Sequence, residues 1–112
     1  MENERSARIV ERRESTAVML AATERDVARI VAAARLDSGD DEHDPEGATI
    51  AFERAQAQAL AERLRHQLDE LDQALARIAD GTYGRCEICG EEIAPERLDA
   101  RPTARRCVKH AD

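Results

Sequence analysis

The chain has 112 residues with one Phe, one Tyr and no Trp, and 37% of its residues are charged. One domain's worth of chain with so few aromatic side chains argues against a thick globular core, and long stretches of Ala, Leu, Glu and Arg indicate long helices or a coiled coil. The formal net charge is −7, and residues 37–46 alone carry six acids and no base. No basic stripe occurs elsewhere, which argues against a primary role in binding nucleic acid, because phosphate contacts require clustered cations.

Neither a membrane span nor an export signal is visible in the sequence. No apolar run approaches the length of a transmembrane helix, and the first residues lack the apolar core of a signal peptide. We therefore expect a cytoplasmic protein without membrane contact, in which cysteines stay reduced and ligate metal rather than form disulfides.

The first predicted element is one long helix over residues 4–36. This segment has no Gly or Pro, and its apolar side chains recur near heptad a and d spacing, with Glu24 as a polar interruption. The positions that we assign to its buried seam are Val10, Ala17, Leu20, Val27, Val31 and Ala34. Gly39 follows shortly after the predicted end and is typical of a helix stop.

A second helix is predicted over residues 45–80, with Asp44 as its N-cap, Pro45 at its first position and Gly81 at its end. Its seam advances in alternating steps of four and three residues for most of its length, through Ile50, Ala57, Ala61, Leu64, Leu68, Leu71, Leu75 and Ile78. Two helices of matched length, each about 50 Å at about 1.5 Å per residue, joined by a short polar loop predict an antiparallel hairpin. Its tip is the acidic block.

The C-terminal segment holds all three cysteines in two short clusters. Two residues separate Cys86 from Cys89, and two separate Cys107 from His110. Such pairs supply the four ligands of a tetrahedral zinc site, since two intervening residues let the backbone turn with both side chains aimed at one ion. Gly90 follows the first pair, where a positive φ is expected. A redox dithiol at Cys86 and Cys89 is the alternative, but it leaves the second pair unexplained.

Residues 81–112 have too few apolar side chains for an independent core, so the metal must supply their folding energy. With four protein ligands the zinc has no open position for chemistry, and no catalytic constellation accompanies it. The predicted fold is all-α dominated. A long antiparallel coiled-coil hairpin over residues 1–80, with its acidic tip at 37–46, precedes a small zinc-finger module over 81–112. We predict one structural Zn²⁺ and no enzymatic activity.

Further positions accompany the four ligands. They are Tyr83-Gly84-Arg85-Cys86-x-x-Cys89-Gly90, then Ile93, Arg97-Leu98-x-Ala100-x-Pro102 and the Cys107 pair. Placed after a coiled-coil hairpin, this pattern resembles the DksA/TraR family of bacterial transcription regulators. The close match covers residues 81–110, and the helical architecture extends it over nearly the whole chain. His110 stands where the family usually has a fourth cysteine.

The resemblance implies a zinc-binding regulator that binds RNA polymerase directly, without contacting DNA. In this family the hairpin enters the polymerase secondary channel, brings its acidic tip near the catalytic magnesium and changes promoter-complex stability, often together with the nucleotide ppGpp. The functional tip then comprises Asp40, Asp41, Asp44 and Glu46. The family tip reads roughly Asp-x-x-Asp-x-Ala, and Glu46 stands here in place of the alanine. Arg97 receives two alternative roles, contact with polymerase or packing within the zinc module.

Other functions are compatible with the sequence. A zinc-stapled coiled-coil module could bind a protein other than RNA polymerase, and the acidic block could be a solvated loop. Transcript cleavage in the manner of the Gre factors would need tip carboxylates that hold a second magnesium ion, but the zinc module is not theirs.

Overall fold

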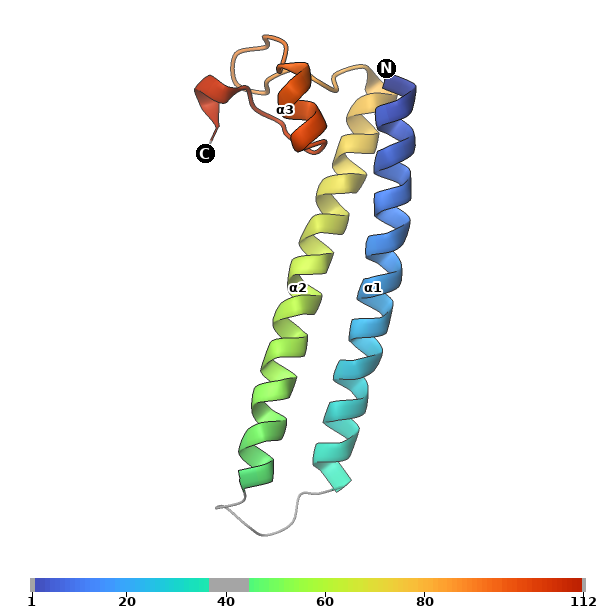
Figure 1. Cartoon of the computed structure of the whole chain (residues 1–112), viewed down its shortest axis with the longest axis vertical. Coiled ribbons are helices and arrows are strands. Elements are labelled where there is room, and N and C mark those ends of the chain that lie inside the picture. The colour runs from blue at the N-terminus through green and yellow to red at the C-terminus, as the bar shows by residue number, and fades with distance from the viewer. Residues whose placement is uncertain (1, 37–44, 112) are drawn as a thin grey trace. The chain divides into compact units, whose positions relative to one another are not determined.

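The computed structural model describes residues 2–36 and 45–111, and side chains over 4–36 and 47–111. Two long helices are followed by a short helix and a 3-10 turn: α1 (Glu2–Leu36), α2 (Pro45–Asp80), α3 (Pro95–Ala100) and η1 (Val108–His110) (Figure 1). In this described part of the chain no strand forms, and the one isolated antiparallel bridge joins Arg85 to Glu92. The predicted all-α hairpin followed by a zinc-finger module is confirmed. Among the described residues, no helix has both the length and the apolar character needed to cross a membrane.

The chain divides into two compact units, one made of Met1–Ser15 with Leu68–Asp112 and the other of Thr16–Gln67. In the first unit Arg13 of α1 pairs with Asp72 of α2, and in the second Glu24 pairs with Arg65 at 3.0 Å. Glu24 follows Arg13 in α1, whereas its partner Arg65 precedes Asp72 in α2. This reversed order is that of an antiparallel pair of helices. The predicted boundary at residue 80 between a hairpin domain and a zinc-finger domain stays a prediction.

The helix ends lie close to the positions that the sequence predicts. α1 ends at Leu36, as expected, and begins at Glu2, two residues before the predicted start. α2 begins at Pro45, whose fixed φ suits the first helical position. The predicted N-cap, Asp44, and the predicted stop, Gly39, lie outside the described residues.

The C-terminal end of α2 is a glycine cap. Gly81 has a φ of +82°, and its N–H donates to the carbonyl oxygen of Ile78 at 3.3 Å. The N–H of Thr82 donates to the carbonyl oxygen of Arg77 at 2.9 Å. These two bonds form a Schellman motif, which needs a left-handed residue after the helix and therefore ends α2 at Asp80.

The predicted seam of α2 is confirmed. Three of its members are buried (Ala61, Leu64 and Leu71), and five are half-buried (Ile50, Ala57, Leu68, Leu75 and Ile78). Ala74 was not assigned to the seam, yet it is fully buried and belongs to the core that α2 shares with the zinc module.

The predicted seam of α1 is wrong at Val10. Val10 is 41% exposed, whereas Ile9 is 1% exposed. The buried and half-buried residues that advance in alternating steps of four and three are Ile9, Arg13, Thr16, Leu20, Thr23, Val27, Ile30 and Ala34. This set contains Leu20, Val27 and Ala34 of the predicted seam, and has the preceding neighbours of Val10, Ala17 and Val31 in their place. Ala17 and Val31 are themselves half-buried.

Two threonines occupy seam positions of α1 that apolar spacing could not identify. Thr16 and Thr23 are both buried. The hydroxyl of Thr23 donates to the carbonyl oxygen of Met19 at 2.8 Å, so its polar group is satisfied within the helix. The expected interruption at Glu24 is therefore no break in the seam, because Glu24 lies beside it and is exposed.

The core of the first unit joins the zinc module to both long helices. Its buried members are Ile9, Leu71, Ala74, Tyr83, Cys86, Ile93, Leu98, Ala104 and Cys107. The hydroxyl of Tyr83 donates to the carbonyl oxygen of Pro102 at 2.8 Å, which satisfies the buried phenol. The module therefore shares one core with α1 and α2, and two of the predicted zinc ligands are part of it.

Candidate metal centre

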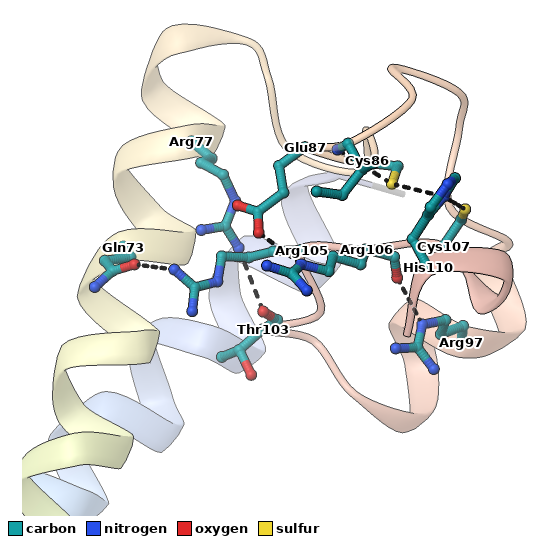
Figure 2. Close-up of polar contacts among 11 residues, drawn as sticks. Gln73, Arg77, Cys86, Glu87, Arg97, Thr103, Arg105, Arg106, Cys107 and His110 are labelled. Carbon is teal, nitrogen blue, oxygen red and sulfur yellow. Dashed lines mark hydrogen bonds and ion pairs between the residues drawn. The ribbon is translucent and has the colours of Figure 1, made fainter. Parts of the chain in front are cut away.

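Four side chains meet at one point of the module: Cys86, Cys89, Cys107 and His110. One ligand atom of each lies within 4.8 Å of the other three. The Sγ atoms of Cys89 and Cys107 are 3.8 Å apart, and Nδ1 of His110 lies 3.3 Å from Sγ of Cys107 and 3.8 Å from Sγ of Cys86. Figure 2 shows the His110 ring between the sulfurs of Cys86 and Cys107.

These separations fit a tetrahedral zinc ion. Zn–S bonds of about 2.3 Å and Zn–N bonds of about 2.1 Å imply S–S edges of about 3.8 Å and S–N edges of about 3.6 Å. The observed edges lie within a few tenths of an ångström of these values. They are far longer than a disulfide bond of about 2.05 Å, and all three cysteines are free. The cluster is therefore positioned to bind one metal ion, and three thiolates with one imidazole are a zinc donor set.

The first cysteine pair is shaped by its own backbone. The N–H of Gly90 donates to the carbonyl oxygen of Cys86 at 2.9 Å, and Gly90 has the predicted positive φ, +75°. The N–H of Ile88 donates to Sγ of Cys86 at 3.4 Å, and the N–H of Cys86 donates to the carbonyl oxygen of Glu91 at 2.8 Å. The turn thus aims Cys86 and Cys89 at one point and places an N–H donor on the ligand sulfur.

The second pair is brought together by η1. Cys107 precedes this short turn, and the N–H of His110 donates to the carbonyl oxygen of Cys107 at 3.0 Å. Cys86 and Cys107 are buried, whereas Cys89 is exposed and His110 is half-buried. The site therefore has an apolar side toward the core and a solvent-facing side at Cys89 and His110.

Two of the ligand thiols, Cys86 and Cys89, differ in acidity before the metal binds. Burial raises the pKa of Cys86, but backbone N–H donors at Cys107, Cys89 and Ile88 outweigh it and lower that pKa to about 6. The N–H of Glu91 lowers the pKa of Cys89, but desolvation and the two neighbouring thiols raise it overall. Cys86 is thus a stronger acid than Cys89, and a bound zinc ion deprotonates the thiols that coordinate it.

Comparison with known proteins shows which kind of zinc finger this module resembles. A family model described as "Prokaryotic dksA/traR C4-type zinc finger" matches residues 81–109. The solved structure of transcription factor DksA2 from Pseudomonas aeruginosa matches 96% of this chain and 78% of its own, with a TM-score of 0.79 and 28% sequence identity. The module at residues 81–109 is therefore a zinc finger of the DksA/TraR type.

The curated relatives that this chain matches are longer proteins. General stress protein 16O of Bacillus subtilis is 42% identical over 74 residues, which is 66% of this chain and 45% of that protein. RNA polymerase-binding transcription factor DksA of Caulobacter vibrioides is 46% identical over 62 residues, 55% of this chain and 44% of that protein. The chain therefore spans less than half the length of these relatives.

The fourth ligand position is where this zinc finger departs from the four-cysteine description of the family model. The family match ends at residue 109, one residue before His110. Because neutral imidazole replaces a thiolate, the zinc-bound site carries one negative charge less than a four-cysteine site. Both donor sets form closed tetrahedral zinc sites. The cofactor is one zinc ion, and if all four of these side chains bind it, it has no open position.

The other predicted site residues are only partly described. Asp40, Asp41 and Asp44 lie outside the described residues, and Glu46 lies in the first turn of α2 with its side chain outside the description. Arg97 is half-buried on α3, and its Nε donates to the carbonyl oxygen of Arg106 at 2.9 Å. Neither of its two predicted roles is tested by this contact alone.

Sequence reasoning did not single out Glu87 and Arg106. Their side chains form an ion pair, with Nε of Arg106 donating to Oε1 of Glu87 at 2.8 Å. In the sequence, the one feature that could have indicated this pair is that each residue adjoins a predicted ligand: Glu87 follows Cys86, and Arg106 precedes Cys107. Opposite charges beside two ligands of one ion are brought near each other once both pairs bind it.

Proposed function

We propose that this protein binds RNA polymerase directly and changes transcription initiation. The observation that carries the proposal is that the hairpin and the zinc module align together with transcription factor DksA2, over 96% of this chain. The name of the Caulobacter relative, an RNA polymerase-binding transcription factor, supplies the partner. Since the chain spans only part of its curated relatives, polymerase binding is inferred for it from these similarities.

The proposed mechanism is insertion of the hairpin into the polymerase secondary channel, so that the acidic block at residues 37–46 comes near the catalytic magnesium. Six carboxylates in ten residues would interact there with the metal or with surrounding cations, in a confined space where Coulomb interactions exceed their surface values. The role is non-enzymatic and needs no DNA contact. The nucleotide ppGpp is proposed to act in the same complex with polymerase, and the location is the cytoplasm, where that enzyme works.

The direct test is retention of purified cognate RNA polymerase on the immobilised protein, compared with a variant whose residues 37–44 are replaced by a short Gly-Ser turn. We expect the intact protein to retain polymerase and the shortened variant to retain much of it, because the helix sides and the zinc module would provide most of the docking area. Failure of the intact, zinc-loaded protein to retain polymerase would reject the proposal. It would favour a coiled-coil partner of another kind.

A further inference from the structure

The chain just before the third zinc ligand, Cys107, is held by three contacts. The carbonyl oxygen of Arg106 accepts a hydrogen bond from Nε of Arg97 at 2.9 Å. The side chain of Arg106 pairs with the Glu87 carboxylate at 2.8 Å. The carbonyl oxygen of Arg105 accepts a hydrogen bond from the N–H of Glu87 at 2.9 Å. Figure 2 shows Arg97 reaching the carbonyl oxygen of Arg106 from α3.

These contacts connect the two ligand pairs to each other. Glu87 directly follows the ligand Cys86, and Arg106 directly precedes the ligand Cys107. A side-chain ion pair and a backbone hydrogen bond therefore join chain positions that each lie one residue from a zinc ligand.

The segment before Cys107 is also attached to α2. Nη1 of Arg105 donates to Oε1 of Gln73 at 2.8 Å, and Nη2 of Arg77 donates to the carbonyl oxygen of Thr103 at 3.4 Å (Figure 2). The backbone on which the third ligand sits is thus fixed at Thr103 and Arg105 by the long helix, which leaves Arg106 as the last point of support before the metal.

The rotation of α3 determines where Arg97 can reach. Successive helical residues point about 100° apart, and here three consecutive ones have three partners. Arg97 contacts the segment before Cys107, Leu98 is buried in the core, and Asp99 pairs with Arg5 of α1 at 3.3 Å. Because the core and α1 both hold α3, the guanidinium of Arg97 is presented to the carbonyl oxygen of Arg106 in a fixed direction.

We propose that Arg97 and the Glu87–Arg106 pair are positioning residues of the zinc site, which hold Cys107 at its ligand position and thereby raise zinc affinity. Residues that orient metal ligands from outside the coordination sphere commonly change metal affinity by about 10–100-fold. Arg97 has the larger effect because it is half-buried and bonds a backbone carbonyl. The Glu87 and Arg106 side chains are 41% and 36% exposed, and exposed ion pairs contribute little.

The test is zinc affinity of the full chain, measured by competition with a chromogenic chelator. Arg97→Met removes the hydrogen-bond donor while keeping an apolar stem, and we expect affinity to fall by about tenfold or more. Glu87→Gln and Arg106→Gln should each lower affinity by about two- to fivefold, and the exchanged variant Glu87→Arg, Arg106→Glu should recover most of that loss. Arg13→Gln is the matched control, since its pair with Asp72 lies in the same unit at similar exposure and should leave affinity unchanged.

A cobalt(II) spectrum separates positioning from a general effect on folding. Displacement of the Cys107 sulfur changes the thiolate-to-cobalt charge-transfer and ligand-field bands, whereas a lower unfolding temperature alone does not. We expect changed bands in Arg97→Met and smaller changes in Arg97→Lys, which keeps the charge and serves if the Met variant does not fold. Parental zinc affinity and a parental cobalt spectrum in the folded Arg97 variant would overturn the role of Arg97. Absence of recovery in the exchanged variant would overturn that of the pair.

Discussion

At the residue scale, Tyr83 is a buried member of the core that the zinc module shares with the helix ends, so the pKa of its phenol is a probe of that core. It is the only tyrosine in a chain without tryptophan, and its ring is buried while its hydroxyl donates to Pro102. Burial raises the pKa of its phenol above the ordinary 10.0, against the opposing effect of three arginines, Arg5, Arg77 and Arg8. The neutral phenol is therefore favoured in the folded state.

The sign of the resulting pH dependence follows. Because the folded pKa of Tyr83 is raised, its contribution to stability is fully present below about pH 10, the unfolded pKa, and is lost as pH rises through the folded pKa. Ultraviolet titration of the phenolate should give an apparent pKa above 10.0 for the zinc-loaded protein and the ordinary value in denaturant. Tyr83→Phe should cost about 0.5–1.5 kcal/mol at neutral pH. An ordinary pKa in the folded protein would contradict the buried placement.

The ligand set makes a second prediction at this scale. The parent should bind one zinc per chain through Cys86, Cys89, Cys107 and His110, as measured by elemental analysis after dialysis. Cys107→Ala combined with His110→Ala leaves two ligands and should abolish stoichiometric binding. His110→Cys, the control, recreates the four-cysteine pattern and should retain one zinc. Undiminished zinc in the double variant would reject the four-ligand assignment.

At the scale of the elements, two adjacent residues of α1 differ in burial, because Ile9 lies in the seam and Val10 does not. Ile9→Ala removes a side chain that is 1% exposed and should lower the free energy of unfolding by about 2–5 kcal/mol. Val10→Ala, the neighbouring control, alters a side chain that is 41% exposed and should change it by about 0.5 kcal/mol or less. Denaturant unfolding of the zinc-loaded proteins gives both values. Equal losses would contradict the register of α1.

The two helices also differ in how well their buried residues could be predicted from the sequence. In α2 the leucines and isoleucines keep strict spacing, so periodicity alone located the buried face. In α1 two residues at the start compete, since Ile9 and Val10 are both apolar and adjacent. Thr23 could not be placed because its burial depends on a hydroxyl bond to Met19, which forms only within the helix.

The metal site was predictable for a different reason. Ligand spacing such as that of Cys86 and Cys89 is a local property of the chain, so it can be recognised in the sequence alone. The supporting contacts are not local. Arg97 reaches Arg106, and Arg106 reaches Glu87 across 19 positions of the chain, and such contacts exist only after the two ligand pairs and α3 have come together.

Removal of zinc should affect more than the module that binds it. The buried ligands Cys86 and Cys107 share one core with Ile9, Leu71 and Ala74, so loss of the metal removes support from the helix ends as well. Amide exchange before and after chelation should show lost protection over residues 2–15 and 68–111, with smaller changes over 16–67. Circular dichroism should show that much helix persists. Loss restricted to residues 81–111 would contradict a shared core.

At the scale of the whole molecule, charge is concentrated in one segment. Residues 37–46 carry six acids and no base in a chain of net charge −7, and under the proposed function this segment acts on polymerase. Asp41→Asn combined with Asp44→Asn removes two carboxylates at little steric cost, and asparagine also serves as an N-cap. Zinc content, helix content and polymerase binding should therefore stay close to those of the parent.

The measurement that tests the account most directly is in-vitro transcription initiation by the cognate RNA polymerase, with binding measured on the same protein samples. The parent should change transcript yield at a responsive promoter, and the Asp41→Asn, Asp44→Asn variant should bind polymerase to a similar extent but lose that effect. A parent that binds polymerase without altering initiation at any promoter tested would contradict the regulatory function. A double variant that regulates as well as the parent would show that the acidic segment is only a solvated turn.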